Sequence, residues 1–355
     1  MPVTLNDVAR RAGVSLTTAS RVINNDSIHR VSPKTAKKVL DAAVELRYTP
    51  NEFARNLRQK RRDTKDTLHI GVLLTSAIDS YNDNFFYDIL LGIQTQTADS
   101  GHSLSFTYSF SDTSPTAIQN AIAANAVSGM ILLGRMTADT LHFIAKNNKH
   151  VVYAGLNPVN HQFDEVVCDG FLCAKTAVKH LAALGHRRIG YVGTASPGGS
   201  SMLLNEYRYD GYIKTMEELD LPVSRDFIVD TPLNIEMAFQ AVDKRLAHGN
   251  IPDALFCAND YCAIGALKAL RLHKLKVPQD VAIVSIDDID MAAYSRPMLS
   301  TIQIPRQEIG KYSVKLLTDQ IHSRRKYPIR ISMPFQLIVR ESCGGDVLKR
   351  PSVVL

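Results

Sequence analysis

The sequence predicts an α/β protein in which a small N-terminal helix-turn-helix module precedes a core of two doubly wound parallel-sheet subdomains. Three observations predict this class. The excess positive charge is confined to the start of the chain, two short amphipathic segments there are joined at a glycine, and apolar strands alternate with helical segments from residue 67 onward. A chain of 355 residues also has room for two or three compact units.

The distribution of charge separates the chain into two parts. Residues 1–66 contain 14 Lys and Arg against 7 Asp and Glu, although the net charge of the whole protein is only +6. The remainder therefore carries 27 basic and 28 acidic side chains and is nearly neutral. A basic module attached to a neutral body is typical of a protein whose N-terminus binds a polyanion.

Two helices joined by a tight turn are predicted in the basic part. The first begins at Thr4, which with Asp7 resembles a capping box, and it ends at Gly13. Ser15 is the expected N-cap of a second helix over residues 16–23. Because the turn is too short for antiparallel packing, the pair predicts a helix-turn-helix whose second helix enters the major groove of DNA.

The second helix should bury one face and present the other to DNA. Arg21 can make a bidentate contact to guanine, while Leu16 and the methyl group of Thr17 can touch thymine methyl groups. A third helix is predicted to begin at Ser32 and Pro33, a capping residue followed by proline at the first helical position. The predicted DNA contacts of this module are Thr4, Leu16, Thr17, Ser20, Arg21 and Asn24.

The N-terminal sequence resembles the lactose/galactose-repressor family of bacterial regulators. The resemblance rests on TLNDVARRAGVSLTTASRVINN at residues 4–25 and VSPKTAKKVLDAAVELRYTPNEFARNL at residues 31–57, and it continues more weakly along the chain. It implies a repressor that binds a double-stranded operator as a homodimer. In the family, the segment matching residues 51–58 is a hinge helix that orders on operator DNA. The family match adds Asn51, Ala54 and Leu57 as DNA contacts, with Leu57 wedged into the minor groove.

The resemblance also implies a domain plan. We expect a DNA-binding domain at residues 1–50 with its motif at about 5–24, and a hinge and linker at 51–66. The effector-binding domain at 67–345 should have the type-I periplasmic-binding-protein-like fold. Its N-subdomain would comprise about 67–168 and 304–328, and its C-subdomain about 169–303 and 329–345. LIVRES at residues 337–342 would mark the last strand of that core.

Polar side chains at the ends of the predicted strands are expected to bind the effector. In open α/β sheets ligands lie beyond the carboxyl ends of the strands, and fixed amides, carboxylates and a guanidinium suit a polyhydroxylated ligand. The resemblance assigns this role to Phe86, Asn157, Arg208, Asn259 and Asp287. Residues 82–86 have the sequence NDNFF in place of the usual NPFY, and this sequence resembles that of family members that sense galactosides. A nucleobase or nucleoside acting as corepressor is the alternative effector, because an arginine and an aspartate can grip a purine equally well.

Other functional classes lack support in the sequence. No GxGxxG, GxxxxGK[ST], GxSxG or HExxH motif occurs, so no cofactor, metal or catalytic site is predicted. No apolar run has the roughly 20 residues needed to span a bilayer, and no secretory signal is visible, which argues against an exported sugar-binding protein. We therefore expect a cytoplasmic protein with five reduced, mostly buried cysteines.

Effector control is expected to act on the distance between the two hinge segments of a dimer. Binding between the two subdomains would select one of two closure states, and a sugar would favour the state that releases DNA. On this view Arg208→Ala should abolish the ligand response and leave operator binding intact. The C-terminal tail CGGDVLKRPSVVL has no leucine heptad, so no tail-mediated tetramer is predicted.

Overall fold

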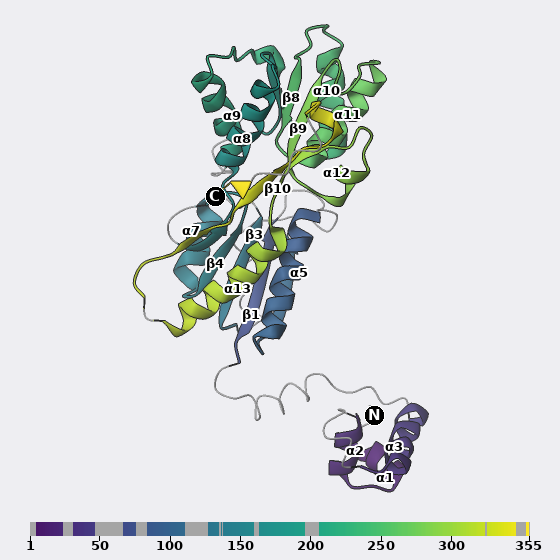
Figure 1. Ribbon diagram of the computed structural model, residues 1–355. Helices are drawn as coiled ribbons and strands as arrows, with labels where there is room; N and C mark the ends of the chain where they lie inside the picture. The colour runs from purple at the N-terminus through teal and green to yellow at the C-terminus, as the bar shows by residue number, and fades with distance from the viewer. Residues whose placement is uncertain are drawn as a thin grey trace. The chain divides into compact units, whose positions relative to one another are not determined.

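The computed structural model describes two compact units, which we call the N-terminal unit (Met1–Thr67) and the core unit (Leu68–Leu355) (Figure 1). The described residues are 5–23, 31–46, 67–75, 84–110, 127–134, 136, 138–159, 163–195, 206–323, 325–345 and 353–354. The candidate DNA contacts Thr4, Asn24, Asn51, Ala54 and Leu57 lie outside them.

The N-terminal unit consists of three short helices around a small apolar core. They are α1 (Leu5–Ala12), α2 (Leu16–Ile23) and α3 (Pro33–Glu45). Gly13 ends α1 with a φ of +65°, and the Ser15 hydroxyl accepts a hydrogen bond from the amide of Thr18 at 3.1 Å. The cluster that joins the helices contains Val8, Ala9, Ala19, Val22, Ala36, Val39 and Ala42. The predicted helix-turn-helix is therefore confirmed.

The first lobe of the core unit is built on a parallel sheet with the strand order β11-β5-β4-β3-β1-β2. Its strands are β1 (His69–Thr75), β2 (Ser103–Phe110), β3 (Gly129–Gly134), β4 (Val151–Gly155), β5 (Asp164–Val167) and β11 (Arg330–Ser332). Side chains alternate along β1: Ile70, Val72 and Leu74 pack in the cluster that includes α5 (Asn84–Asp99) and α13 (Arg306–His322). Leu73 faces the opposite way, toward α7 (Ala138–Asn147).

The second lobe contains a mixed sheet with the order β13-β12-β10-β9-β8-β6-β7. Its strands are β6 (Ile189–Gly193), β7 (Ile228–Asp230), β8 (Ala254–Cys257), β9 (Ala282–Asp287), β10 (Ser300–Gln303), β12 (Phe335–Ile338) and β13 (Val353–Val354). Helices α8 (Gly170–Ala183) and α9 (Tyr207–Glu218) share one apolar cluster with this sheet, whereas α10 (Ile235–Leu246) and α11 (Asp260–Leu272) share another. The short α12 (Asp290–Tyr294) follows β9. Two parallel-sheet lobes were expected, and both are present.

Two details of the structure differ from the expected plan. The last crossing between lobes was expected near residue 328, whereas Arg330–Ser332 pairs in parallel with Glu165–Val167 in the first sheet. The chain therefore crosses after Ser332, because the backbone of this short segment completes the edge of that sheet. The strand in LIVRES is not the last one either, since Val353–Val354 pairs antiparallel with Phe335–Gln336.

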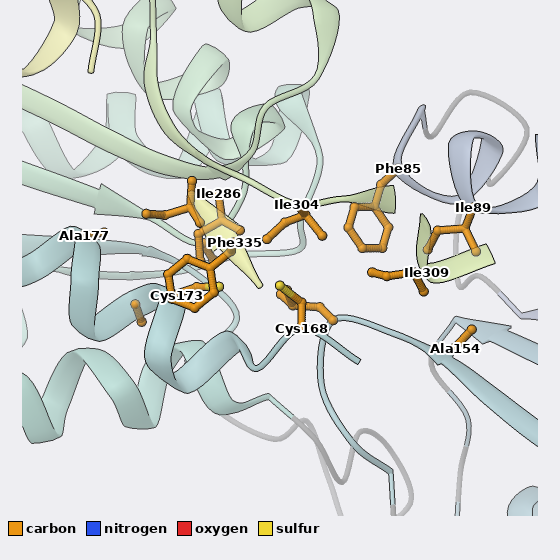
Figure 2. Packing of buried hydrophobic residues seen from close by; sticks show 14 of the residues in the cluster. Phe85, Ile89, Ala154, Cys168, Cys173, Ala177, Ile286, Ile304, Ile309 and Phe335 are labelled. Atoms are coloured by element: carbon orange, nitrogen blue, oxygen red, sulfur yellow. The ribbon is translucent and has the colours of Figure 1, made fainter. Parts of the chain in front are cut away.

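One apolar cluster continues from the first lobe into the second through the crossing segments (Figure 2). Cys168 follows β5, Ile304 follows β10 and Phe335 begins β12, and all three side chains are buried in this cluster. The five cysteines are all buried and free, as expected. The chain crosses between the lobes at three segments. Because the side chains of these segments are buried in one cluster, the two lobes share an apolar core.

Close contact between α5 and α13 depends on two glycines. A Cβ atom at Gly92 would lie 2.0 Å from the carbonyl oxygen of Gln307, and one at Gly310 would lie 2.1 Å from the carbonyl oxygen of Ile89. The two helix backbones can therefore approach only because both positions lack a side chain. None of the helices in the described part of the chain is long and apolar enough to cross a membrane.

Candidate functional site

The candidate DNA-reading residues of α2 lie on its outer face. Leu16, Thr17 and Arg21 are exposed and Ser20 is half-buried, whereas Ala19 and Val22 on the opposite face are buried. This separation follows from helical spacing, because the buried positions are three apart and the exposed ones flank them. Three lysines of α3 are also exposed, at positions 34, 37 and 38, so the unit presents basic side chains from two helices.

Four of the five candidate effector residues lie where segments of both lobes meet. Asn157 follows β4 of the first lobe, while Asn259 and Asp287 stand at the carboxyl ends of β8 and β9 in the second lobe. Arg208 lies in the first turn of α9. All four are about 5% exposed, although each is polar or charged. Their positions at strand ends are those in which α/β sheets bind ligands.

The guanidinium of Arg208 is engaged by Glu206, a residue that the sequence analysis did not select. Its Nε donates to Oε1 of Glu206 at 2.6 Å, and its Nη2 lies 2.5 Å from Oε2. Its Nη1 donates to the carbonyl oxygen of Ala258 at 2.9 Å. Burial alone would lower the pKa of Arg208, but the Glu206 carboxylate outweighs that effect, and the pKa is raised. The arginine therefore carries a full charge that its neighbour already compensates.

Asn157 and Arg208 approach each other across Gly170. The amide of Gly170 donates to Oδ1 of Asn157 at 2.8 Å. A Cβ at Gly170 would lie 2.3 Å from that oxygen and 3.1 Å from Cγ of Arg208. Glycine at this position thus allows a first-lobe amide and a second-lobe arginine to lie side by side.

Asn259 begins α11 and is followed by a buried carboxyl group. Oδ1 of Asn259 caps the helix by accepting from the amide of Cys262 at 2.9 Å. Asp260 is fully buried and accepts hydrogen bonds from Ser285, Thr301 and the amide of Ile289, at 2.5, 2.7 and 2.8 Å. Burial raises the pKa of Asp260 to about 6, against the opposing effect of these hydrogen bonds. The carboxyl group links α11 to β9 and β10.

The backbone after β9 adopts an unusual conformation that Arg306 supports. Asp287 and Asp288 have φ values of +120° and +54°, which residues other than glycine seldom adopt. Arg306 donates from Nη1 to the carbonyl oxygen of Asp287 and from Nη2 to that of Asp288 at 3.3 Å. Its Nε also donates to Asp88 of α5 at 2.8 Å. Arg306 thus connects the candidate Asp287 to the first lobe.

Phe86 lies in the first turn of α5, two residues before Asp88. It is partly buried against the core, and its ring meets the buried Phe85 edge-on at a centroid distance of 5.2 Å. A hollow of about 240 Å³ adjoins the same region. Its lining residues are Asp88, Asp288, Gln303, Ile304, Pro305, Arg306, Gln307 and Glu308. The structure therefore brings Asn157 and Arg208 together. Asn259 and Asp287 are linked through Asp260, which follows Asn259 and accepts a hydrogen bond from Ser285 in the strand that ends at Asp287. Phe86 shares α5 with Asp88, which binds Arg306.

Sequence reasoning missed Glu206 and Arg306 for different reasons. Glu206 stands at the N-cap of α9, where an acidic residue normally needs no further explanation. The partners of Arg306 lie 18 to 218 positions away in the chain, a separation that no periodicity reveals. Among the described residues, no group of three or more histidine, cysteine or acidic side chains is arranged to hold a metal ion.

Two family models match the chain in the order expected. Residues 4–51 match the model described as bacterial regulatory proteins, lacI family, and residues 178–343 match the periplasmic binding protein-like domain. A relative called HTH-type transcriptional repressor PurR, from Actinobacillus pleuropneumoniae serotype 3, is 30% identical over 345 residues. The HTH-type transcriptional repressor MelR of Bacillus subtilis is 30% identical over 349 residues. Both alignments cover 96% of this chain and 98% of the relative.

Solved structures agree over nearly the whole length. A lac repressor dimer bound to operator and the anti-inducer ONPF is 28% identical, with a TM-score of 0.71 and coverage of 97% of this chain and 99% of that one. The regulator CelR in complex with cellobiose is 26% identical, with a TM-score of 0.69 and coverage of 96% and 99%. Members of this family are DNA-binding regulators rather than enzymes. The chain therefore belongs to the lacI family of bacterial regulatory proteins and is a DNA-binding transcriptional repressor.

Proposed function

We propose that this repressor binds a pseudo-palindromic operator as a homodimer in the cytoplasm and that a small sugar, with a galactoside as the first candidate, controls that binding. The observation that carries the proposal is the meeting of Asn157 with Arg208 beside the strand ends that hold Asn259 and Asp287. These buried amide, carboxylate and guanidinium groups suit a hydroxylated ligand. Phe86 would add an aromatic surface for the apolar face of a sugar ring.

In the DNA-binding half of the proposal, α2 lies in the major groove. Leu16, Thr17 and Arg21 would contact base edges and Ser20 the backbone, because these are the outward-facing side chains of that helix. Thr4, Asn24, Asn51, Ala54 and Leu57 complete the proposed contacts. Residues 1–50 would form the DNA-binding domain and residues 51–66 the hinge between it and the effector-binding domain.

The proposed coupling runs through the relative closure of the two lobes. A ligand held by Asn157 on the first lobe and Arg208 on the second stabilises one closure state over the other. The free energy available for this shift equals the difference in its affinity for the two states, typically about 1–3 kcal/mol. Arg306 supports the same coupling, since it binds Asp88 on the first lobe and the backbone of Asp287 on the second. For a sugar, the expected result is release of the operator.

A nucleobase acting as corepressor remains the alternative, because the same donors and acceptors match the edge of a purine. The two effectors predict opposite effects on DNA binding. A sugar should weaken operator binding, and a nucleobase should strengthen it. Titrating the operator in the presence of galactosides, other disaccharides and nucleobases separates the two proposals by sign.

Arg21→Ala is expected to weaken binding to the specific operator by about 1–3 kcal/mol and to relax specificity at one position of each half-site. Arg21 is exposed on the outer face of α2, so the variant should retain the fold. Arg21→Lys is the matched control, since it keeps the charge and loses the bidentate geometry. Fluorescence anisotropy on operators varied at each base pair provides the measurement. Equal weakening on every sequence would show that Arg21 contacts only phosphate.

A further inference from the structure

We infer that Glu206 determines the charge of the ligand that the effector site accepts, so that the site selects an uncharged, hydroxylated molecule and rejects anions. The inference rests on the effector site proposed above and narrows its ligand class. It excludes phosphorylated sugars, sugar acids and nucleotides. It follows from the charges and hydrogen bonds around Arg208.

An arginine in a binding site ordinarily attracts carboxylates and phosphates, since its planar fork matches two oxygens at once. Here Glu206 of the same chain already occupies that fork, with one carboxylate oxygen on Nε and the other on Nη2. The two side chains are only 7% and 9% exposed, so water screens the pair little. An incoming anion would have to displace a buried carboxylate that is covalently part of the site.

Among the described residues, Asp287 is a second carboxylate near the arginine. Asp287, itself 5% exposed, lies close enough to stabilise the charged form of Arg208 electrostatically. The site thus places two carboxylates, Glu206 and Asp287, beside one guanidinium. A further negative charge would have to compete with these carboxylates for the guanidinium in surroundings of low dielectric, whereas a neutral ligand would not.

Arg208 nevertheless retains hydrogen-bonding capacity for a neutral ligand. A guanidinium has five N–H groups, and three of those on Arg208 are donated to Glu206 and to the carbonyl oxygen of Ala258. Within the described residues, the second hydrogens of Nη1 and Nη2 have no acceptor. A hydroxyl or carbonyl oxygen can accept them without adding charge. Buried donors of this kind favour a ligand that supplies such oxygens.

The test is to titrate the full-length protein with inorganic phosphate at constant ionic strength. The melting temperature of the core unit is measured at each phosphate concentration. We expect no saturable stabilisation of the wild type. Glu206→Gln keeps a capping oxygen and frees the guanidinium, so it should bind phosphate at least about ten-fold more tightly than the wild type. Glu218→Gln, which removes a more exposed carboxylate of the same helix from its pair with Lys175, should behave like the wild type. The double variant E206Q/R208Q should also show no phosphate binding.

Two results would overturn the inference. One is saturable phosphate binding by the wild type with an affinity similar to that of Glu206→Gln. The other is a folded Glu206→Gln protein that gains no affinity. If that variant does not fold, the wild-type titration still decides, because saturable binding there contradicts the inference. Operator titration of the wild type tests the proposed function separately: intact DNA binding with strong phosphate binding refutes only the role of Glu206.

Discussion

Replacing Arg208 with alanine is expected to destabilise the core unit by about 3–5 kcal/mol, because the change leaves the carboxylate of Glu206 buried without its partner. The sequence alone suggested that this variant would lose only its ligand response. The structure adds a loss of stability to that expectation, since both members of the pair are less than 10% exposed. Chemical denaturation followed by tyrosine fluorescence can measure the loss. The chain has no tryptophan, and its tyrosines other than Tyr48 lie in the core unit.

A matched variant separates the loss of the pair from the loss of the arginine. E206Q/R208Q removes both charges and keeps groups that can hydrogen-bond to each other, so it should recover most of the lost stability. It should also fail to respond to ligand, since the guanidinium donors are absent. An Arg208→Ala protein as stable as the wild type would mean that Glu206 is well solvated when its partner is removed.

Asp260 should contribute a loss of stability to the core unit as the pH rises from about 4 to about 7. Its pKa in the folded protein is about 6, above the ordinary value of 3.8, so the folded state holds this proton to higher pH than the unfolded state. The stabilisation is therefore complete below the unfolded pKa and is lost as the pH rises through 6. A difference of about two units corresponds to on the order of 2–3 kcal/mol.

Asp260→Asn provides the comparison, because an amide cannot ionise and can still accept from the Ile289 amide and donate to the two hydroxyls. The free energy of unfolding of the wild type minus that of the variant should decrease between about pH 4 and pH 7. Comparing the two proteins cancels the titration of the other carboxylates, which both proteins share. A difference that stays constant or increases with pH would contradict the buried position of this carboxyl group.

The pattern of apolar residues was sufficient to predict most of the fold. The alternation of apolar strands with helical segments from residue 67 onward indicated helices that cover sheets, because a helix that covers a sheet shows an apolar stripe. Strands such as β3 and β4, which are buried on both faces, appear as continuous apolar runs. Their number and alternation also indicated two lobes.

The strands with the weakest signal in the sequence carry charge or are very short. β5 has the sequence DEVV and is fully buried, a pattern that periodicity assigns to the surface. Its two acidic residues are neutralised by Arg325 and Arg330, more than 160 positions along the chain. β11, with three residues, pairs beside it. Interactions between such distant positions depend on the tertiary structure and have no local signal.

The candidate effector site was predicted residue by residue through the family resemblance, but its electrostatics were not. Arg208 was selected by its position in the family motif, whereas its pairing with Glu206 is visible only in the structure. The same is true of Asp287, whose backbone is held by Arg306 from the crossing segment. Ligand-contacting residue types can therefore be inferred from sequence, whereas the charge that those residues present to a ligand depends on their neighbours in the fold.

The central claim is that one ligand, bound between the lobes, changes the affinity of the N-terminal unit for DNA. Operator titration by fluorescence anisotropy tests it most directly, using full-length protein with and without a saturating concentration of whichever neutral sugar stabilises the core unit. We expect the sugar to weaken operator affinity by about 5–150-fold and the operator to weaken sugar affinity by the same factor. Identical operator affinity with and without the bound sugar would contradict the account.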